Sequence, residues 1–91
     1  MDPELNRKIT EALRLACRPD DSPIIHLEER GTGRVGGSVV STKFVRMTPS
    51  ARQDAIWEQL DAALSPPERS RITFIVAETR EEHEALAELG S

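Results

Sequence analysis

Few side chains in this sequence could do chemistry, and they are scattered along it. The chain has one cysteine, Cys17, and two histidines, His26 and His83. A single cysteine excludes an intrachain disulfide framework, and it excludes zinc sites built from four cysteines or from a cysteine pair and a histidine pair. Cys17 ends a helix-like stretch with apolar neighbours, which favours a small buried side chain over a reactive thiol. Cys17 and His26 are therefore only weak candidates for metal ligands.

The segments that look like catalytic or phosphate-binding motifs stand in the wrong context. Residues 31–36 match G-x-G-x-x-G and residues 33–36 match G-x-x-G, but a strand rather than a helix is expected to follow them. We interpret this segment as a glycine-rich hairpin. No serine lies in a G-x-S-x-G sequence, and neighbouring carboxylates such as Glu28 and Glu29 point in different directions along a strand. The sequence therefore predicts a protein that is not an enzyme.

Basic side chains gather in the middle of the chain, although its formal net charge is −4. Such a stretch is typically a solvated surface, and the alternative is a docking patch for an acidic partner or for nucleic acid. The acidic net charge and the lack of interleaved aromatic residues weaken the nucleic-acid alternative. The basic residues of this stretch are Arg30, Arg34, Lys43, Arg46 and Arg52.

The elements that must position these residues follow from apolar periodicity and from capping residues. In chain order we expect a helix at 2–17 with Asp2 as its N-cap, a strand at 23–29, a hairpin turn at 30–33, a strand at 36–44, a helix at 51–64, a strand at 71–77 and a helix from 79. Thr48 or Ser50 is expected to cap the second helix, and Thr79 with Glu82 forms a capping-box pattern.

The connections between these elements predict the topology. A tight hairpin makes the first two strands antiparallel, whereas the helical crossover makes the second and third strands parallel. The first strand should direct His26 away from Ile25 and Leu27, and Gly36-Gly37 allow a bulge in the second. The apolar run at 71–77 predicts a strand that is central or covered on both faces. The predicted fold is α+β, with order α-β-β-α-β-α and a mixed three-stranded sheet packed against helices, in one domain over residues 1–91.

Three segments together resemble a known family. Residues 41–60 read S-T-K-F-V-R-M-T-P-S-A-R-Q-D-A-I-W-E-Q-L, residues 71–75 read R-I-T-F-I, and residues 79–82 read T-R-E-E. This pattern resembles the BolA-like family, whose domains have an α-β-β-α-β core related to the class II KH fold. The family's positions are matched by Ser41, Phe44, Arg52, Gln53, Ile56, Trp57 and Leu60.

The resemblance implies a protein-binding domain that partners a monothiol glutaredoxin in iron–sulfur cluster trafficking and has a place in the stress response. It also implies that recognition involves the loop and helix after the second strand. The residues expected to bind a partner or nucleic acid are Arg34, Lys43, Arg46, Arg52 and Gln53. Gln53 and Thr73 stand where the family has histidine, and neither is an ordinary cluster ligand. We therefore expect no cofactor of the domain's own, and the absence of histidine at these two positions disfavours a shared iron–sulfur cluster.

Two alternatives remain open at this level. One is a KH-like nucleic-acid-binding transcriptional regulator, and the other is an orphan interaction module that forms a homodimer through a sheet edge. No window approaches the length of apolar sequence that a membrane span needs, and the N-terminal residues lack the features of a secretory signal. The sequence therefore predicts a cytoplasmic protein without membrane contact.

Overall fold

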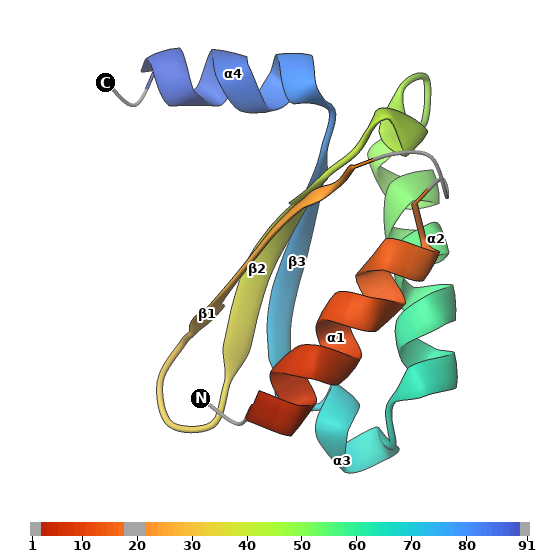
Figure 1. Ribbon diagram of the computed structural model, residues 1–91, viewed down its shortest axis with the longest axis vertical. Helices are drawn as coiled ribbons and strands as arrows, with labels where there is room; N and C mark the ends of the chain where they lie inside the picture. Colours follow the sequence, from red (N-terminus) through yellow and green to blue (C-terminus); the bar gives the residue numbers. More distant parts are fainter. Residues whose placement is uncertain (1–2, 18–21, 90–91) are drawn as a thin grey trace.

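The structure is a computed structural model that describes residues 3–17 and 22–89. One sheet has the strand order β1-β2-β3. Helices α1 and α2 cover one face of this sheet, and α4 leaves the end of β3 toward the opposite side (Figure 1). The elements are α1 (Pro3–Leu15), β1 (Ile24–Glu29), β2 (Val35–Val40), the 3-10 helix η1 (Thr42–Phe44), α2 (Pro49–Ala63), α3 (Pro66–Arg69), β3 (Ile72–Glu78) and α4 (Arg80–Leu89).

The predicted α+β class with a mixed three-stranded sheet is confirmed. Strands β1 and β2 pair antiparallel with Ile24 opposite Val40, and β2 and β3 pair parallel with Val40 opposite Glu78. The hairpin turn has positive φ values at Gly31 (72°) and Gly33 (74°), a conformation that glycine adopts without steric cost. The G-x-G-x-x-G segment is thus the hairpin that its context predicts.

The position of β3 in the sheet corrects one expectation. Strand β3 is an edge strand, and its Phe74 and Val76 are 37% and 40% exposed on the face that α1 and α2 leave open. The central strand is β2, because both the hairpin and the crossover connection attach to it. A register shift occurs between Val35 and Gly36, close to the expected bulge, but the extra residue is Thr73 in β3.

The second strand also ends earlier than predicted. It stops at Val40, and the chain then turns through η1, where the Ser41 hydroxyl accepts a hydrogen bond from the Lys43 N–H at 3.0 Å. This short helix directs Phe44 into the core, where the side chain is fully buried. Periodicity predicted an extended chain here because a single 3-10 turn is too short to show a helical repeat.

Helix capping follows the sequence signals where the structure describes them. The hydroxyl of Thr48 accepts a hydrogen bond from the Ala51 N–H at 3.1 Å, so Thr48 rather than Ser50 caps α2. Helix α3 was not predicted, although Ser65 and Glu68 form a reciprocal capping box at its start. The predicted cap Asp2 lies outside the described residues, as does most of the predicted loop after α1.

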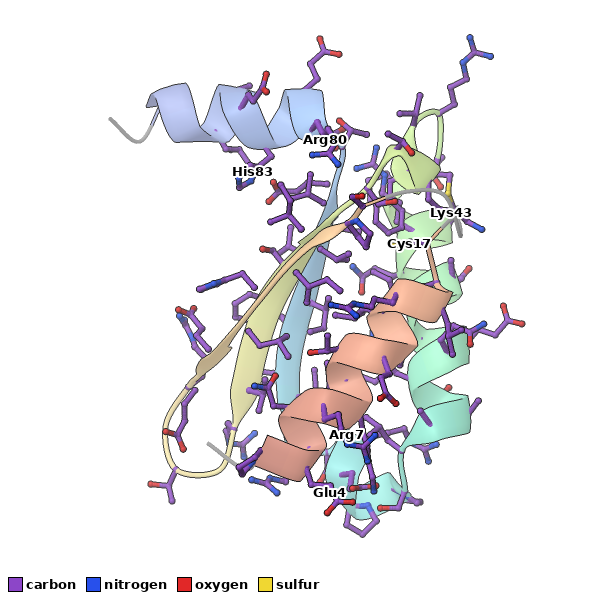
Figure 2. All side chains as sticks on the ribbon, viewed as in Figure 1. Glu4, Arg7, Cys17, Lys43, Arg80 and His83 are labelled. Atoms are coloured by element: carbon purple, nitrogen blue, oxygen red, sulfur yellow. The ribbon has the colours of Figure 1, made fainter. Side chains whose placement is uncertain are left out.

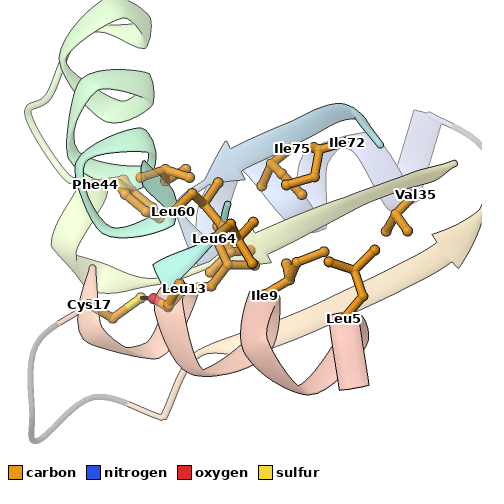
Figure 3. Packing of buried hydrophobic residues seen from close by; sticks show 13 residues of the cluster. Leu5, Ile9, Leu13, Cys17, Val35, Phe44, Leu60, Leu64, Ile72 and Ile75 are labelled. Atoms are coloured by element: carbon orange, nitrogen blue, oxygen red, sulfur yellow. Dashed lines mark hydrogen bonds between the residues drawn. The ribbon is translucent and has the colours of Figure 1, made fainter. Parts of the chain in front are cut away.

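The core lies between the two covering helices and the inner face of the sheet (Figure 3). Cys17 belongs to it, with 7% exposure, and its thiol donates a hydrogen bond to the Leu13 carbonyl at 3.2 Å. The other buried apolar side chains of this cluster are Leu5, Ile9, Ala12, Leu13, Val35, Val39, Phe44, Ile56, Leu60, Leu64, Ile72 and Ile75.

None of the described helices covers the opposite face of the sheet along most of its length (Figure 1). Ile24, His26 and Glu28 of β1 are exposed there, as the alternation along the strand predicts. Ile25 and Leu27 point to the other face and pack against the core. The uncovered face therefore combines charged and apolar side chains.

Candidate interaction site

Arg52, in the first turn of α2, joins three separate segments. Its Nε donates to the Met47 carbonyl at 3.0 Å, and its Nη1 donates to the Ala77 carbonyl at 3.1 Å. Both terminal nitrogens also donate to the Glu82 carboxylate, at 2.6 and 3.1 Å. The side chain is only 12% exposed. Its planar fork of donors is thereby occupied, so Arg52 positions the segments around it and offers little free charge.

Glu82 fixes the start of α4 at the end of β3. Its carboxylate accepts from the Thr79 N–H at 2.9 Å, and the Thr79 hydroxyl accepts from the Glu82 N–H at 3.2 Å. This confirms the predicted capping box. The hydrogen bonds from Arg52, followed by the bond from the Thr79 N–H, lower the pKa of Glu82 from 4.5 to about 2. The carboxylate therefore stays ionised and paired with Arg52 at neutral pH.

A hollow of about 560 Å³ opens between η1, the loop that follows it and the first turns of α4. It forms because β2 and β3 are parallel, so that the segments following both strands meet at the same edge of the sheet. Arg46, Arg52 and Arg80 line it together with Glu81 and Glu82, and its apolar wall comes from Val45 and Ala85. The hollow thus combines charges of both signs with an apolar wall.

Arg46 is the unusual residue of this hollow. Its φ is 67°, in the left-handed region, and it is the one residue other than glycine with a positive φ in the described parts of the chain. The residue is exposed, and it makes no hydrogen bond or ion pair with any described residue. Arg80, by contrast, donates to the Ser22 carbonyl at 2.9 Å. Among the described arginines that line this hollow, Arg46 is therefore the one that a partner can reach without breaking a hydrogen bond or an ion pair.

The basic residues singled out from the sequence do not form one patch. Arg46 and Arg52 line the hollow, whereas Arg34 lies in the hairpin at the far end of β2 (Figure 1). Lys43 extends away from Arg80 on the side of the molecule where α1 ends (Figure 2). The basic stretch is continuous only along the chain, because β2 separates its two halves by the length of a strand.

Gln53 has a role that its sequence position did not suggest. Its amide nitrogen donates to the Ile75 carbonyl at 2.8 Å, on the edge of β3 that faces away from β2. A second hollow of about 220 Å³ lies beside this contact, between Pro49 and the backbone of β3. Gln53 and Arg52 together bind two successive outward carbonyls of β3, so both help to hold α2 against the sheet edge.

The weak metal-ligand candidates lie apart from each other. Cys17 is in the core beneath the sheet, whereas His26 is exposed on the opposite face. His83 projects from α4 toward the sheet (Figure 2), and its Nδ1 lies 3.0 Å from Oε2 of Glu78. Over residues 3–17 and 22–89, no three side chains of the kinds that commonly bind metals are gathered at one place.

The contribution of α4 to this site was not predicted from the sequence. Arg80, Glu81, Glu82 and Ala85 all line the larger hollow, whereas the sequence indicated only a capping box at the start of this helix. The predicted topology contained the necessary information. Parallel strands end at the same side of the sheet, so a helix that begins directly after β3 must lie beside the loop that follows β2.

In the part of the chain that the structure describes, every helix is too short or too polar to cross a lipid bilayer. In comparisons with known proteins, no family model, curated protein or solved structure matches the chain.

Proposed function

We propose that this chain is a non-enzymatic protein-interaction domain that binds its partner at the hollow between η1 and α4. The observation that carries the proposal is Arg46, which is held in a left-handed backbone conformation with an exposed and unpaired guanidinium at this hollow. The Arg46 side chain makes no hydrogen bond or ion pair with any other described residue. We therefore assign this side chain to a contact with another molecule.

The backbone conformation of Arg46 also favours a role in recognition. A left-handed conformation costs an L-residue about 1–2 kcal/mol relative to the right-handed one, and glycine avoids most of that cost. Residues held in such conformations cluster at functional sites, where the surrounding structure maintains them. Arginine at this position is therefore better explained by recognition of an acidic group than by stability.

The partner class that we propose is a glutaredoxin-type protein. Support comes from the resemblance of residues 41–60 to the BolA-like family, because these residues include η1, the loop with Arg46 and the first turns of α2. The observed elements from α1 to β3 include the α-β-β-α-β order that the resemblance implies. An acidic or polar surface on the partner would contact Arg46, and an apolar side chain would contact Val45.

The residues present do not fit a shared iron–sulfur cluster. Gln53 and Thr73 occupy the positions where the resemblance implies histidine, and the Gln53 amide is already bonded to Ile75. The Cys17 thiol is buried and donates to a helix carbonyl, so it is not presented to a partner. We therefore propose partner binding without a cluster ligand from these residues.

Nucleic-acid binding receives less support from this geometry. Phosphate recognition depends on several unpaired Lys and Arg side chains on one surface, but Glu82 neutralises Arg52 and Glu81 lies in the same hollow. Arg34 and Lys43 are directed to other parts of the surface. Among the described residues of the hollow, only Arg46 is an arginine without a hydrogen bond or ion pair, and it lies near two carboxylates, which favours a protein surface over a polyanion.

The proposal is tested by titrating the protein with a monothiol glutaredoxin, in apo and cluster-loaded forms, by isothermal calorimetry. We expect Arg46→Glu to weaken binding about tenfold, equivalent to about 1.4 kcal/mol, because it places a carboxylate where an acidic group docks. Visible circular dichroism of the loaded glutaredoxin should not change on complex formation, since no cluster ligand is contributed.

Arg34→Glu is the matched control, because it makes the same charge change on an exposed arginine at the other end of β2. It should leave the affinity within about twofold of the original protein. Equal losses from both variants would show a general charge effect and would contradict docking at the hollow. No detectable binding to either glutaredoxin form would overturn the proposed partner class.

A further inference from the structure

The two edges of the sheet are not equivalent. On the outer side of β3, the carbonyl of Ile75 accepts from Gln53 at 2.8 Å and the carbonyl of Ala77 accepts from Arg52 at 3.1 Å. Both carbonyls face away from β2, where an added strand would have to bind. Two α2 side chains therefore block strand addition at the β3 edge.

At the β1 edge, no described side chain binds the outward backbone groups of Ile25 or Leu27 in this way. Arg30 N–H donates to the Arg34 carbonyl at 2.7 Å, which fixes the alternation of the antiparallel ladder: even-numbered residues of β1 bond to β2, and odd-numbered residues point their backbone groups outward. The outward N–H and C=O groups of Ile25 and Leu27 have no partner among the described residues. Such an edge is a template for pairing with another strand.

The side chains of β1 select the partner strand. When two copies of β1 pair antiparallel, the outward backbone groups of one copy bond to the outward backbone groups of the other. The twofold axis that relates the two copies then passes through one residue position. In the registers that pair the middle of the strand, this position is His26, Leu27 or Glu28. An axis at His26 places the two imidazoles opposite each other, and an axis at Glu28 does the same for the two carboxylates. An axis at Leu27 places His26 opposite Glu28 of the second copy, twice.

We propose that two copies of this chain form a homodimer by antiparallel pairing of their β1 edges about Leu27, which joins the two sheets into one. His26 and Glu28 then face each other at non-hydrogen-bonded positions, where opposing side chains approach most closely. Both side chains are exposed, at 70% and 46%, so they can reach across. Within one chain, Glu28 already contacts Arg30 at 2.9 Å and His26 at 3.9 Å, and the second copy would complete a row of alternating charge.

The proposed dimer is independent of the partner-binding hollow. The hollow lies beside the end of β3 and the start of α4, whereas the dimer uses the opposite edge of the sheet. The uncovered faces of the two sheets become one surface, on which Ile24 of each copy lies near the junction. Failure of dimerisation would leave the proposed function untouched, and the reverse also holds.

Sedimentation velocity over a concentration series at about pH 6 tests the pairing. Glu28→Lys and His26→Glu each place like charges opposite each other twice, and each should raise the dimer dissociation constant about fivefold or more. The double variant His26→Glu/Glu28→Lys restores opposite charges in the Leu27-centred register, and it should return the constant to within about twofold of the original value.

Glu58→Lys serves as the control, since it reverses an exposed charge on α2 far from β1 and should not change the dissociation constant. All of these positions are exposed, and far-ultraviolet circular dichroism confirms that each variant keeps its fold. A chain that stays monomeric at millimolar concentration overturns the proposal. A dimer that the single variants do not weaken, or that the double variant does not restore, places the contact elsewhere and also overturns it.

Discussion

At the residue scale, the left-handed backbone of Arg46 is expected to lower the stability of the fold, while its side chain is expected to bind the partner. Replacing Arg46 with glycine removes the left-handed strain of about 1–2 kcal/mol, and the greater freedom of glycine in the unfolded chain takes back about 0.5–1 kcal/mol. We expect Arg46→Gly to stabilise the fold by about 0.5 kcal/mol in urea unfolding while weakening partner binding. Arg34→Gly, at a residue without a positive φ, should lose stability instead. A destabilised Arg46→Gly variant would contradict the strain argument.

The two adjacent glycines of β2 differ in what surrounds them. A Cβ on Gly37 would collide with the backbone carbonyl of His26, whereas a Cβ on Gly36 would meet the ring of Phe74 at 2.8 Å and Cγ of Arg30 at 3.1 Å. The latter side chains lie on the open face and can move aside. We expect Gly37→Ala to cost about 2–3 kcal/mol and Gly36→Ala about 1 kcal/mol or less, measured by urea unfolding. Equal costs would show that the open face is as rigid as the core.

Contacts between residues close in the sequence were easier to predict than contacts between residues far apart in it. The caps at Thr48 and at Thr79 with Glu82 were predictable because their hydrogen bonds join residues three apart. The contacts of Arg52 and Gln53 with β3 were not, because they span 25 and 22 residues and depend on the exact position of α2 beside the sheet. Sequence spacing carries no information about that position.

At the element scale, polar contacts rather than apolar burial hold the described side chains of α4, from Arg80 to Leu86, in place. The described side chains from Arg80 to Leu86 are all exposed, and the helix projects from the body of the molecule (Figure 1). Its anchors include the Arg52–Glu82 pair, the contact between His83 and Glu78, and the hydrogen bond from Arg80 to the Ser22 carbonyl. Helix α3 is anchored in a similar way, because Lys8 of α1 binds Glu68 at 2.9 Å.

These anchors predict how stability depends on pH. The pKa of Glu82 is lowered to about 2 mainly by Arg52, and that of Glu68 is lowered to about 2 by the Ser65 N–H and then by Lys8. A carboxylate whose pKa is lower in the folded chain stabilises the fold fully above its unfolded pKa, and this contribution is lost as the pH falls through the folded value. Stability should therefore fall between about pH 5 and pH 2.

Glutamine variants isolate each carboxylate. Glu82→Gln and Glu68→Gln should each lower stability at neutral pH and flatten its decline toward pH 2, as followed by chemical unfolding at several pH values. Glu58→Gln, which removes an exposed carboxylate without a partner among the described residues, should leave the profile unchanged. Hydrogen exchange should show that Glu82→Gln accelerates exchange in α4 more than in α1 or α2. An unchanged pH profile in both test variants would contradict these assignments.

Strand β3 shows why the type of an element is easier to predict than its surroundings. Its run of apolar residues is typical of a strand covered on both faces, and the strand itself was predicted almost to its observed bounds. Its place at the sheet edge is set by the connections, which make β2 central. Phe74 compensates in part, because its ring lies over Gly36 and Arg30 lies 5.3 Å from the ring centroid.

At the scale of the whole molecule, the connections determined what could be predicted. The antiparallel hairpin and the parallel crossover both follow from the length of the intervening segments, and both are present. The grouping of the basic residues depends instead on which ends of the strands they occupy. Arg34 and Arg46 lie at opposite ends of β2. The folded arrangement shows that residues at the start of α4, and not Arg34, line the hollow together with Arg46.

The blocked edge of β3 also limits how far assembly can proceed. A sheet with two open edges can keep adding copies, which leads to fibres. In the proposed dimer, pairing about Leu27 uses the β1 edge of both chains at once, while two described side chains of α2 occupy outward carbonyls of the β3 edge. Growth therefore stops at two copies, and Gln53 and Arg52, by occupying two carbonyls, protect the folded chain against open-ended polymerisation through its sheet.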